Sequence, residues 1–214
     1  MTKRKIEMSL LKKLKDSFSS RGEPVVIVSG LPRSGTSLAM KMLDAGGMSQ
    51  IIDGIRTADV DNPKGYYEDE RVKDLHKMAD KAWVKDARGR ALKVISFLIK
   101  DLPDENHYKI VFMRRHLDEV LASQNKMLDH RKEANETPDD KMREIYQDHL
   151  KQVFSLMERR PNMDVLFVDY TGVLEDPKGN AEKIRDFLGT SLDVEKMASV
   201  ADRNLYRNRA EAKS

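Results

Sequence analysis

The sequence predicts a three-layer α/β/α fold, with helices on both sides of a mainly parallel central sheet. Three observations predict it. Short β-branched runs alternate with helical stretches, the first run ends in a glycine-containing loop that leads into a helix, and 39% of the residues are hydrophobic, which is enough to fill a core. Alternating strands and helices are typical of parallel sheets, and continuous apolar runs are typical of strands buried on both faces.

Each element is expected where its pattern begins and ends. The apolar runs predict strands at residues 25–28, 91–96, 110–113 and 165–168. Apolar residues at helical spacing, with glycine or proline near the ends, predict helices at residues 37–45, 118–128, 139–158 and 181–188. Between them, residues 130–136 are expected to form a charged loop and residues 170–177 a turn.

The length of 214 residues fits one domain, so we expect a single domain over residues 1–214. Residues 5–19 carry leucines at helical spacing and are expected to form an amphipathic helix that docks on the domain. Residues 203–214 are expected to form a flexible tail.

Composition narrows the classes of partner. The net charge of +3 arises from 39 basic and 36 acidic residues, so any attraction for anions must be local, and no nucleic acid partner is expected. The chain has no cysteine, and its five histidines show no paired ligand spacing, so no metal site is expected. No apolar run approaches the roughly 20 residues of a membrane span, and we expect a cytoplasmic protein.

The loop after the first strand has the spacing of a phosphate-binding loop. It runs Gly30-Leu31-Pro32-Arg33-Ser34-Gly35-Thr36-Ser37. In such a strand-to-helix turn, backbone N–H groups converge on an anion and the helix N-terminus adds partial positive charge. Enzymes that use ATP or GTP carry a lysine where this chain has Thr36. The loop therefore predicts an anionic chain shorter than a triphosphate, with Arg33 as a cation beside it.

Residues 32–37 resemble the 5'-phosphosulfate loop of sulfotransferases that use 3'-phosphoadenylyl sulfate (PAPS). A second segment, Val111-Phe112-Met113-Arg114-Arg115, is followed by Ser123 and resembles the 3'-phosphate site of that family. The resemblance implies a P-loop α/β/α fold. It also implies that the six loop residues Pro32, Arg33, Ser34, Gly35, Thr36 and Ser37 bind the donor, together with Arg115 and Ser123.

Two alternatives stay open at the 3'-phosphate site. Adjacent strand residues point to opposite faces, so Arg114 competes with Arg115, which we prefer on spacing. Either arginine could instead form an ion pair with Asp118 or Glu119 on the following helix. Near the C-terminus, Arg207 is expected to close over the same phosphate, with a solvated tail as the alternative.

Lys93 and Glu68 are the candidates for the chemistry. A lysine inside an apolar run is costly to bury unless it reaches an anion or solvent, and Lys93 resembles the strand lysine that the family places against the transferring sulfo group. The alternative is a lysine that snorkels from an edge strand. Cytosolic members carry a base histidine two residues later, where this chain has Ile95.

A different base is therefore needed. Residues 62–68 resemble the Asn-Pro-x-Gly-Tyr-x-Glu segment of some bacterial sulfotransferase-like proteins, which makes Glu68 the expected base. The alternative role for Glu68 is structural: together with Asp69 and Glu70, its negative charge would favour the positive N-terminal end of a following helix.

The resemblance implies an enzyme that moves a sulfo group from PAPS to a hydroxyl or amine acceptor, releases 3',5'-adenosine bisphosphate (PAP) and needs no metal. Arg33 and Lys93 would offset the developing charge. Two other hypotheses remain. The first is a P-loop small-molecule or nucleotide kinase, and Thr36 argues against it. The second is a noncatalytic module that binds adenosine bisphosphate, which the missing histidine suggests. Neither the acceptor nor the oligomeric state is predicted.

Overall fold

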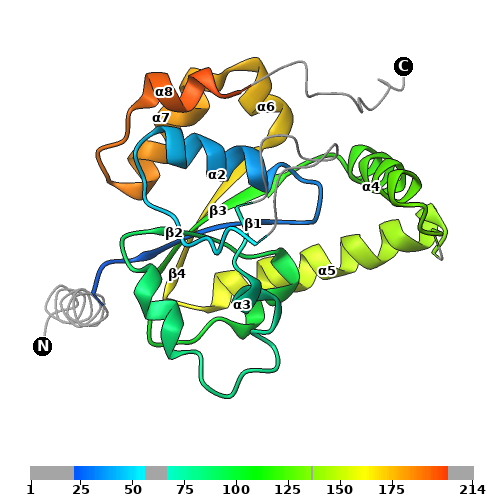
Figure 1. Cartoon of the computed structure of the whole chain (residues 1–214), viewed down its shortest axis with the longest axis horizontal. Coiled ribbons are helices and arrows are strands. Elements are labelled where there is room, and N and C mark those ends of the chain that lie inside the picture. The colour runs from blue at the N-terminus through cyan, green and yellow to red at the C-terminus, as the bar shows by residue number, and fades with distance from the viewer. Residues whose placement is uncertain (1–21, 56–66, 136, 202–214) are drawn as a thin grey trace, which may run out of the picture.

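The computed structural model of the chain describes residues 22–55, 67–135 and 137–201 (Figure 1). Its four strands form one parallel sheet in the order β2-β1-β3-β4. The strands are β1 (Val25–Gly30), β2 (Ala91–Lys93), β3 (Tyr108–Arg114) and β4 (Met163–Asp169). The predicted parallel α/β sheet is therefore confirmed, and β1, which leads into the glycine loop, lies inside it.

Helices cover both faces of the sheet. One face carries α2 (Thr36–Ala45), α6 (Tyr170–Glu175), α7 (Pro177–Leu188) and α8 (Val194–Ser199). The other carries α3 (Glu70–Lys73), α5 (Asp139–Arg159) and the 3-10 helices η1 (Ala82–Ala87) and η2 (Ser96–Asp101). Figure 1 shows the two groups of helices above and below the sheet, so the three predicted layers are present.

Two hydrophobic clusters fill these layers, because successive strand residues point to opposite faces. Val28, Val111 and Val168 pack with the helices of the α2 side. Ile27 and Ile110 pack on the opposite face with residues of α5 and the 3-10 helices. The β-branched runs thus supply both faces of the sheet, which is why the strands read as continuous apolar segments rather than as alternating ones.

A third cluster holds the glycine loop against α4 (Leu117–Arg131). Leu31 of the loop is buried with Val120 and Leu121 of α4 and with Tyr146 of α5. This contact matters for function because it fixes the distance between the loop and the helix that carries Ser123.

Three predicted elements differ from the structure. Strand β2 ends at Lys93 instead of residue 96, because Ser96 begins η2 and bonds to His149 of α5. The charged loop starts later than predicted, because α4 continues to Arg131 and ends on Lys132 in the left-handed conformation. Residues 170–175 form helix α6 instead of a turn, since Tyr170 and its neighbours in α6 are buried.

The remaining helices begin near their predicted residues, although α7 starts at Pro177, after its N-cap Asp176, and not at residue 181. The predicted segments 5–19 and 203–214 lie outside the described residues. In the described part of the chain, no helix has the length and apolar character needed to cross a membrane.

Candidate functional site

The glycine loop turns sharply between β1 and α2, and two glycines make the turn sterically feasible. Gly35 has a φ of +100°, and a Cβ there would lie 2.5 Å from Cδ2 of Tyr170. A Cβ on Gly30 would lie 2.4 Å from Ser34 Oγ and 2.6 Å from the carbonyl oxygen of Met113. A side chain at either position would displace its neighbours, so the loop needs glycine for space as well as for conformation.

The loop also offers polar groups to an anion. Ser34 Oγ is buried and has no hydrogen-bond partner among the described residues, which is unusual for a buried hydroxyl. Thr36 and Ser37 open helix α2, where backbone N–H groups are not used within the helix. The loop thus offers the buried Ser34 hydroxyl, the space left by two glycines and the N-terminus of α2. Together these features fit the phosphate or sulfate that the sequence predicts for this loop.

Lys93 is brought to the loop by its place in the sheet. It lies opposite Val28 of β1, two residues before Gly30, and ends its strand. Its Nζ donates hydrogen bonds to Ser37 Oγ at 3.2 Å and to Glu68 Oε1 at 3.1 Å. The side chains of Lys93 and Glu68 are 7% and 20% exposed, so this is a largely desolvated ion pair. Two candidate residues and the loop therefore meet at one point.

The edge-strand alternative for Lys93 is met in part: β2 lies at the edge of the described sheet, but the amine is buried against Glu68 and the loop. The helix alternative for Glu68 is present in part, because a short helix, α3, directly follows this acidic segment. Helix α3 begins at Glu70 and its N-cap is Asp69, whose side chain accepts a hydrogen bond from the N–H of Arg71. The Glu68 carboxylate instead contacts Lys93.

Arg33 and Ser123 also meet. Arg33 has a φ of +69°, and its Nε donates a hydrogen bond to Ser123 Oγ at 3.0 Å. Ser123 is buried on the side of α4 that faces the loop. The loop cation and the serine of the predicted 3'-phosphate site thus lie side by side, although 90 residues separate them in the sequence.

Arg115 binds protein groups on three sides. Its Nε donates to Glu119 Oε2 at 2.9 Å, and its Nη1 donates to the carbonyl oxygen of Arg33 at 3.2 Å. Its guanidinium also lies over the ring of Tyr170, 4.5 Å from the centroid. The predicted alternative, an ion pair with Glu119, is therefore present, and the same arginine supports the loop. Its contact with a 3'-phosphate stays a prediction.

Arg114 points elsewhere. It forms a two-bond ion pair with Asp169, the neighbouring residue on β4, and is 47% exposed. Of the two adjacent arginines, Arg115 is the one that contacts the loop. Sequence reasoning did not assign Tyr170 to the site, although this ring packs against both Gly35 and Arg115.

Some predicted features cannot be placed. Arg207 and residues 61–66 lie outside the described residues, whereas Pro32 lies in the loop between β1 and α2. Among residues 22–55, 67–135 and 137–201, no group of three or more His, Asp or Glu side chains is arranged to hold a metal ion.

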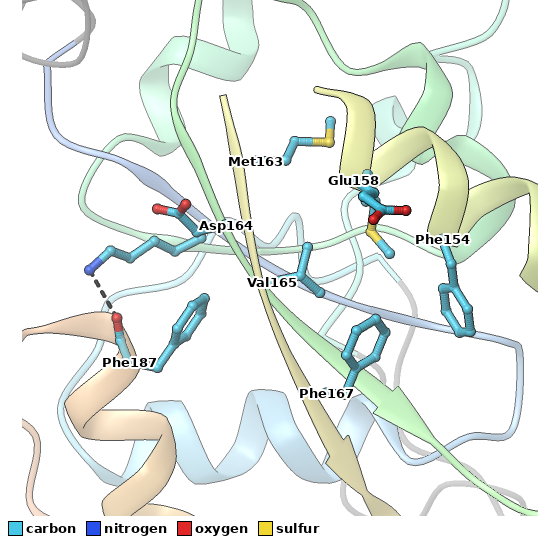
Figure 2. Close-up of a pocket in the computed structure, with 9 residues that line it drawn as sticks. Phe154, Glu158, Met163, Asp164, Val165, Phe167 and Phe187 are labelled. Atoms are coloured by element: carbon cyan, nitrogen blue, oxygen red, sulfur yellow. Dashed lines mark hydrogen bonds between the residues drawn. The ribbon is translucent and has the colours of Figure 1, made fainter. Parts of the chain in front are cut away.

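A separate hollow of about 810 Å³ lies on edge strand β4. Figure 2 shows Val165 and Phe167 of β4 with Phe154 of α5 and Phe187 of α7 on either side. Lys109 in its wall donates hydrogen bonds to the carbonyl oxygens of Phe187 and Leu188. None of the predicted site residues that the structure describes lines this hollow.

Comparison with known proteins gives the family. A model described as "Sulfotransferase domain" matches residues 23–211. No curated protein matches the chain in sequence. The sulfotransferase domain of the olefin synthase from Synechococcus PCC 7002 is 17% identical, with 87% of this chain and 80% of that chain covered and a TM-score of 0.53. The sulfotransferase domain from the curacin biosynthetic pathway is 14% identical, with the same coverage and a TM-score of 0.50.

These two structures share the fold. The family match spans the glycine loop, the Lys93 and Glu68 pair and the Arg115 to Ser123 segment, which are the parts of the chain that the sequence singled out. The chain therefore belongs to the sulfotransferase family.

Proposed function

We propose that this chain transfers a sulfo group from PAPS to a hydroxyl or amine acceptor and releases PAP. The observation that carries the proposal is the convergence of Lys93, Glu68 and Ser37 at the start of α2. This convergence puts a lysine and a carboxylate beside a loop built for an anion, which is what an in-line transfer of a sulfo group requires.

The donor fits the groups that the loop presents. The buried Ser34 hydroxyl, the space left by Gly30 and Gly35 and the N-terminus of α2 suit its 5'-phosphosulfate. Arg115 and Ser123 are proposed to hold its 3'-phosphate. When bound, PAPS supplies the sulfo group, and the bond from sulfur to the bridging phosphate oxygen breaks as the acceptor atom bonds to sulfur.

Three residues of the chain would then take part in the transfer. Glu68 accepts the proton that the acceptor hydroxyl or amine loses, while Lys93 and Arg33 stabilise the negative charge that develops on the bridging oxygen. We further propose that residues 1–214 act as one domain and that the protein works in the cytoplasm.

Ligand-dependent unfolding and turnover test this proposal together. At 100 times its dissociation constant, PAP should stabilise the protein by about 2.7 kcal/mol, whereas ATP with magnesium should not. PAPS should be converted to PAP in the presence of a panel of phenols, sugars and amines. Stabilisation by ATP with magnesium alone would point to a kinase, and PAP binding without turnover on any acceptor would point to a noncatalytic module.

A further inference from the structure

We infer that Asp53 is a positioning residue that holds Glu68 against Lys93. This inference rests on the proposed function, because it gives Asp53 a role through the proposed base. Asp53 lies at the surface, 15 residues before Glu68, and is not part of the glycine loop. What singles it out is the number of its hydrogen bonds to the backbone around Glu68.

Asp53 holds that backbone at two points. Its N–H donates to the carbonyl oxygen of Glu68 at 3.2 Å, and its Oδ2 accepts a hydrogen bond from the N–H of Glu70 at 2.6 Å. The second carboxylate oxygen, Oδ1, accepts from the N–H of Ile55 at 2.9 Å. Asp53 therefore bonds to the chain at residue 68 and at residue 70, on either side of Asp69, and also to the N–H of Ile55.

Asp53 is itself anchored to the strand that carries Lys93. The N–H of Ile51 donates to the carbonyl oxygen of Ala91 at 2.9 Å, and the N–H of Ala91 donates to the carbonyl oxygen of Ser49 at 2.9 Å. Gln50 forms a parallel bridge with Ala91, and its side-chain amide donates to the carbonyl oxygen of Met40 in α2. Residues 49–51 are thus tied both to β2 and to the helix that begins at the glycine loop.

These contacts close a ring. From Lys93 the path runs along β2 to Ala91, crosses to residues 49–51, continues to Asp53, crosses to Glu68 and returns through the ion pair to Lys93. Because these crossings are backbone hydrogen bonds of normal length, they tie the backbone at residue 68 to the sheet, from which the Glu68 side chain reaches Lys93. The backbone N–H of Asp53 makes the crossing at residue 68, and the Asp53 carboxylate adds a second link to the same segment at the N–H of Glu70.

Only a carboxylate fits this task. The pKa of Asp53 is held below its usual value by the hydrogen bonds from the N–H of Ile55 and from the N–H of Glu70, so the group is ionised at neutral pH. An asparagine has a single side-chain acceptor oxygen, and its amide nitrogen would face one of these two N–H donors. The variant Asp53→Asn therefore loses one of the two bonds while the side chain keeps its size.

The test compares Asp53→Asn in the wild-type chain and in a Glu68→Gln background. If Asp53 acts by positioning the base, Asp53→Asn lowers kcat by about 10- to 100-fold in the wild type, as a misplaced group does, and has no further effect once Glu68 is removed. Affinity for PAP should stay unchanged in both. An unchanged kcat, or an equal loss in both backgrounds, would overturn the inference.

Asp193→Asn is the matched control. Asp193 is also an exposed carboxylate that accepts a hydrogen bond from a backbone N–H, that of Lys196, and its pKa is lowered mainly by that bond. This variant should leave kcat unchanged.

A second measurement does not need turnover. The titration of the Glu68 carboxylate, followed by carbon NMR of labelled glutamate and assigned with Glu68→Gln, should shift in Asp53→Asn and not in Asp193→Asn. If wild-type protein fails to turn over PAPS while this shift is seen, the proposed function fails and the positioning role stands. If turnover is normal and neither kcat nor the titration responds to Asp53→Asn, the positioning role fails alone.

Discussion

The Nζ of Lys93 lies 3.1 Å from Oε1 of Glu68, and this ion pair joins the strand beside β1 to the segment that precedes α3. Both side chains are largely removed from solvent. Each charge is therefore stabilised by the other more strongly than in a solvent-exposed ion pair. The same lysine also reaches Ser37 at the start of α2. Variants at this pair must therefore separate a loss of chemistry from a loss of fold.

A double-mutant cycle at the pair makes that separation. Lys93→Met should lower kcat by roughly 100- to 1,000-fold, because it removes a cation aimed at the developing charge. Glu68→Gln should lower kcat by roughly 100- to 10,000-fold, because it removes the base. Affinity for PAP, measured by calorimetry, should change little in either variant.

Stability should follow a different pattern from activity. Lys93→Met removes the cation that the largely buried Glu68 carboxylate contacts and should lower the urea midpoint, whereas the double variant should recover part of that loss without recovering activity. Lys77→Met is the control, since Lys77 forms an exposed pair with Asp74 at 3.3 Å. A Lys93→Met enzyme with wild-type kcat would remove Lys93 from the mechanism.

Substitutions at two glycines test the shape of the phosphate loop. Gly35 and Gly47 both have positive φ, +100° and +95°, but a Cβ at Gly35 would lie 2.5 Å from Tyr170 whereas nothing lies within 4 Å of one at Gly47. Gly47→Ala should therefore cost only the backbone strain of about 1–2 kcal/mol. Gly35→Ala should cost more and should abolish the stabilisation by PAP, as measured by thermal unfolding with and without ligand. Equal effects of the two variants would contradict the close contact with Tyr170.

The two neighbouring arginines should differ in their effect on the free energy of unfolding. Arg115→Met removes a cation that binds the carboxylate of Glu119, which is only 4% exposed, and should cost about 3–5 kcal/mol. Arg114→Met removes an exposed pair and should cost about 0–1 kcal/mol. Urea unfolding measures both. Replacing Arg115 and Glu119 together by methionine should restore most of the loss, and a continued large loss would show that the loop contact to Arg33 dominates.

The same double variant tests the 3'-phosphate assignment. If Arg115 holds that phosphate, the preference for 3',5'-adenosine bisphosphate over adenosine 5'-phosphate should shrink by about 10- to 100-fold, as expected for a lost charged hydrogen bond. The ratio of the two affinities is informative because both nucleotides share the 5'-phosphate and the loop. An unchanged ratio would assign the 3'-phosphate to other residues.

Local patterns predicted most of the fold and failed where distant contacts decide. The strands were found because their buried, β-branched runs are continuous in sequence. The end of β2 was misplaced because Ser96 leaves the sheet to bond with His149, 53 residues away. Helix α6 was missed because six residues are too short to show a helical period, and its place depends on the burial of Tyr170 and Val173.

The candidate site divides in the same way. The glycine loop could be predicted because its sequence pattern lies within eight residues, although the contacts that hold it come from distant residues such as Tyr170. Lys93 and Glu68 could be named as candidates by their types and neighbours, but their contact depends on the register of β2 and on the backbone around residue 68. Asp53 gave no signal, because an exposed aspartate before a glycine is an ordinary turn residue until its hydrogen bonds are seen.

His149 links stability to pH. Its Nε2 lies 2.9 Å from Ser96 Oγ, and its ring stacks on Phe97 with 3.7 Å between centroids. Burial, and then the charge of Lys100, hold the pKa of His149 below its usual 6.5. As the pH falls below about 6.5, the unfolded chain takes up the proton before the native protein does, so stability should decrease until the pH passes the lower native pKa.

The measurement is the urea midpoint between pH 7.5 and 5. The wild type should lose stability across this range, with at most about 1.4 kcal/mol per pH unit from this one group. His149→Gln keeps a polar partner for Ser96 but cannot titrate, so its curve should be flatter, whereas a variant of exposed His76 should follow the wild type. If His149→Gln kept the full slope, the loss would have to come from other groups. Ser96 begins η2 three residues after Lys93. If kcat falls more steeply at acid pH in the wild type than in His149→Gln, the contact between His149 and Ser96 also stabilises the end of β2.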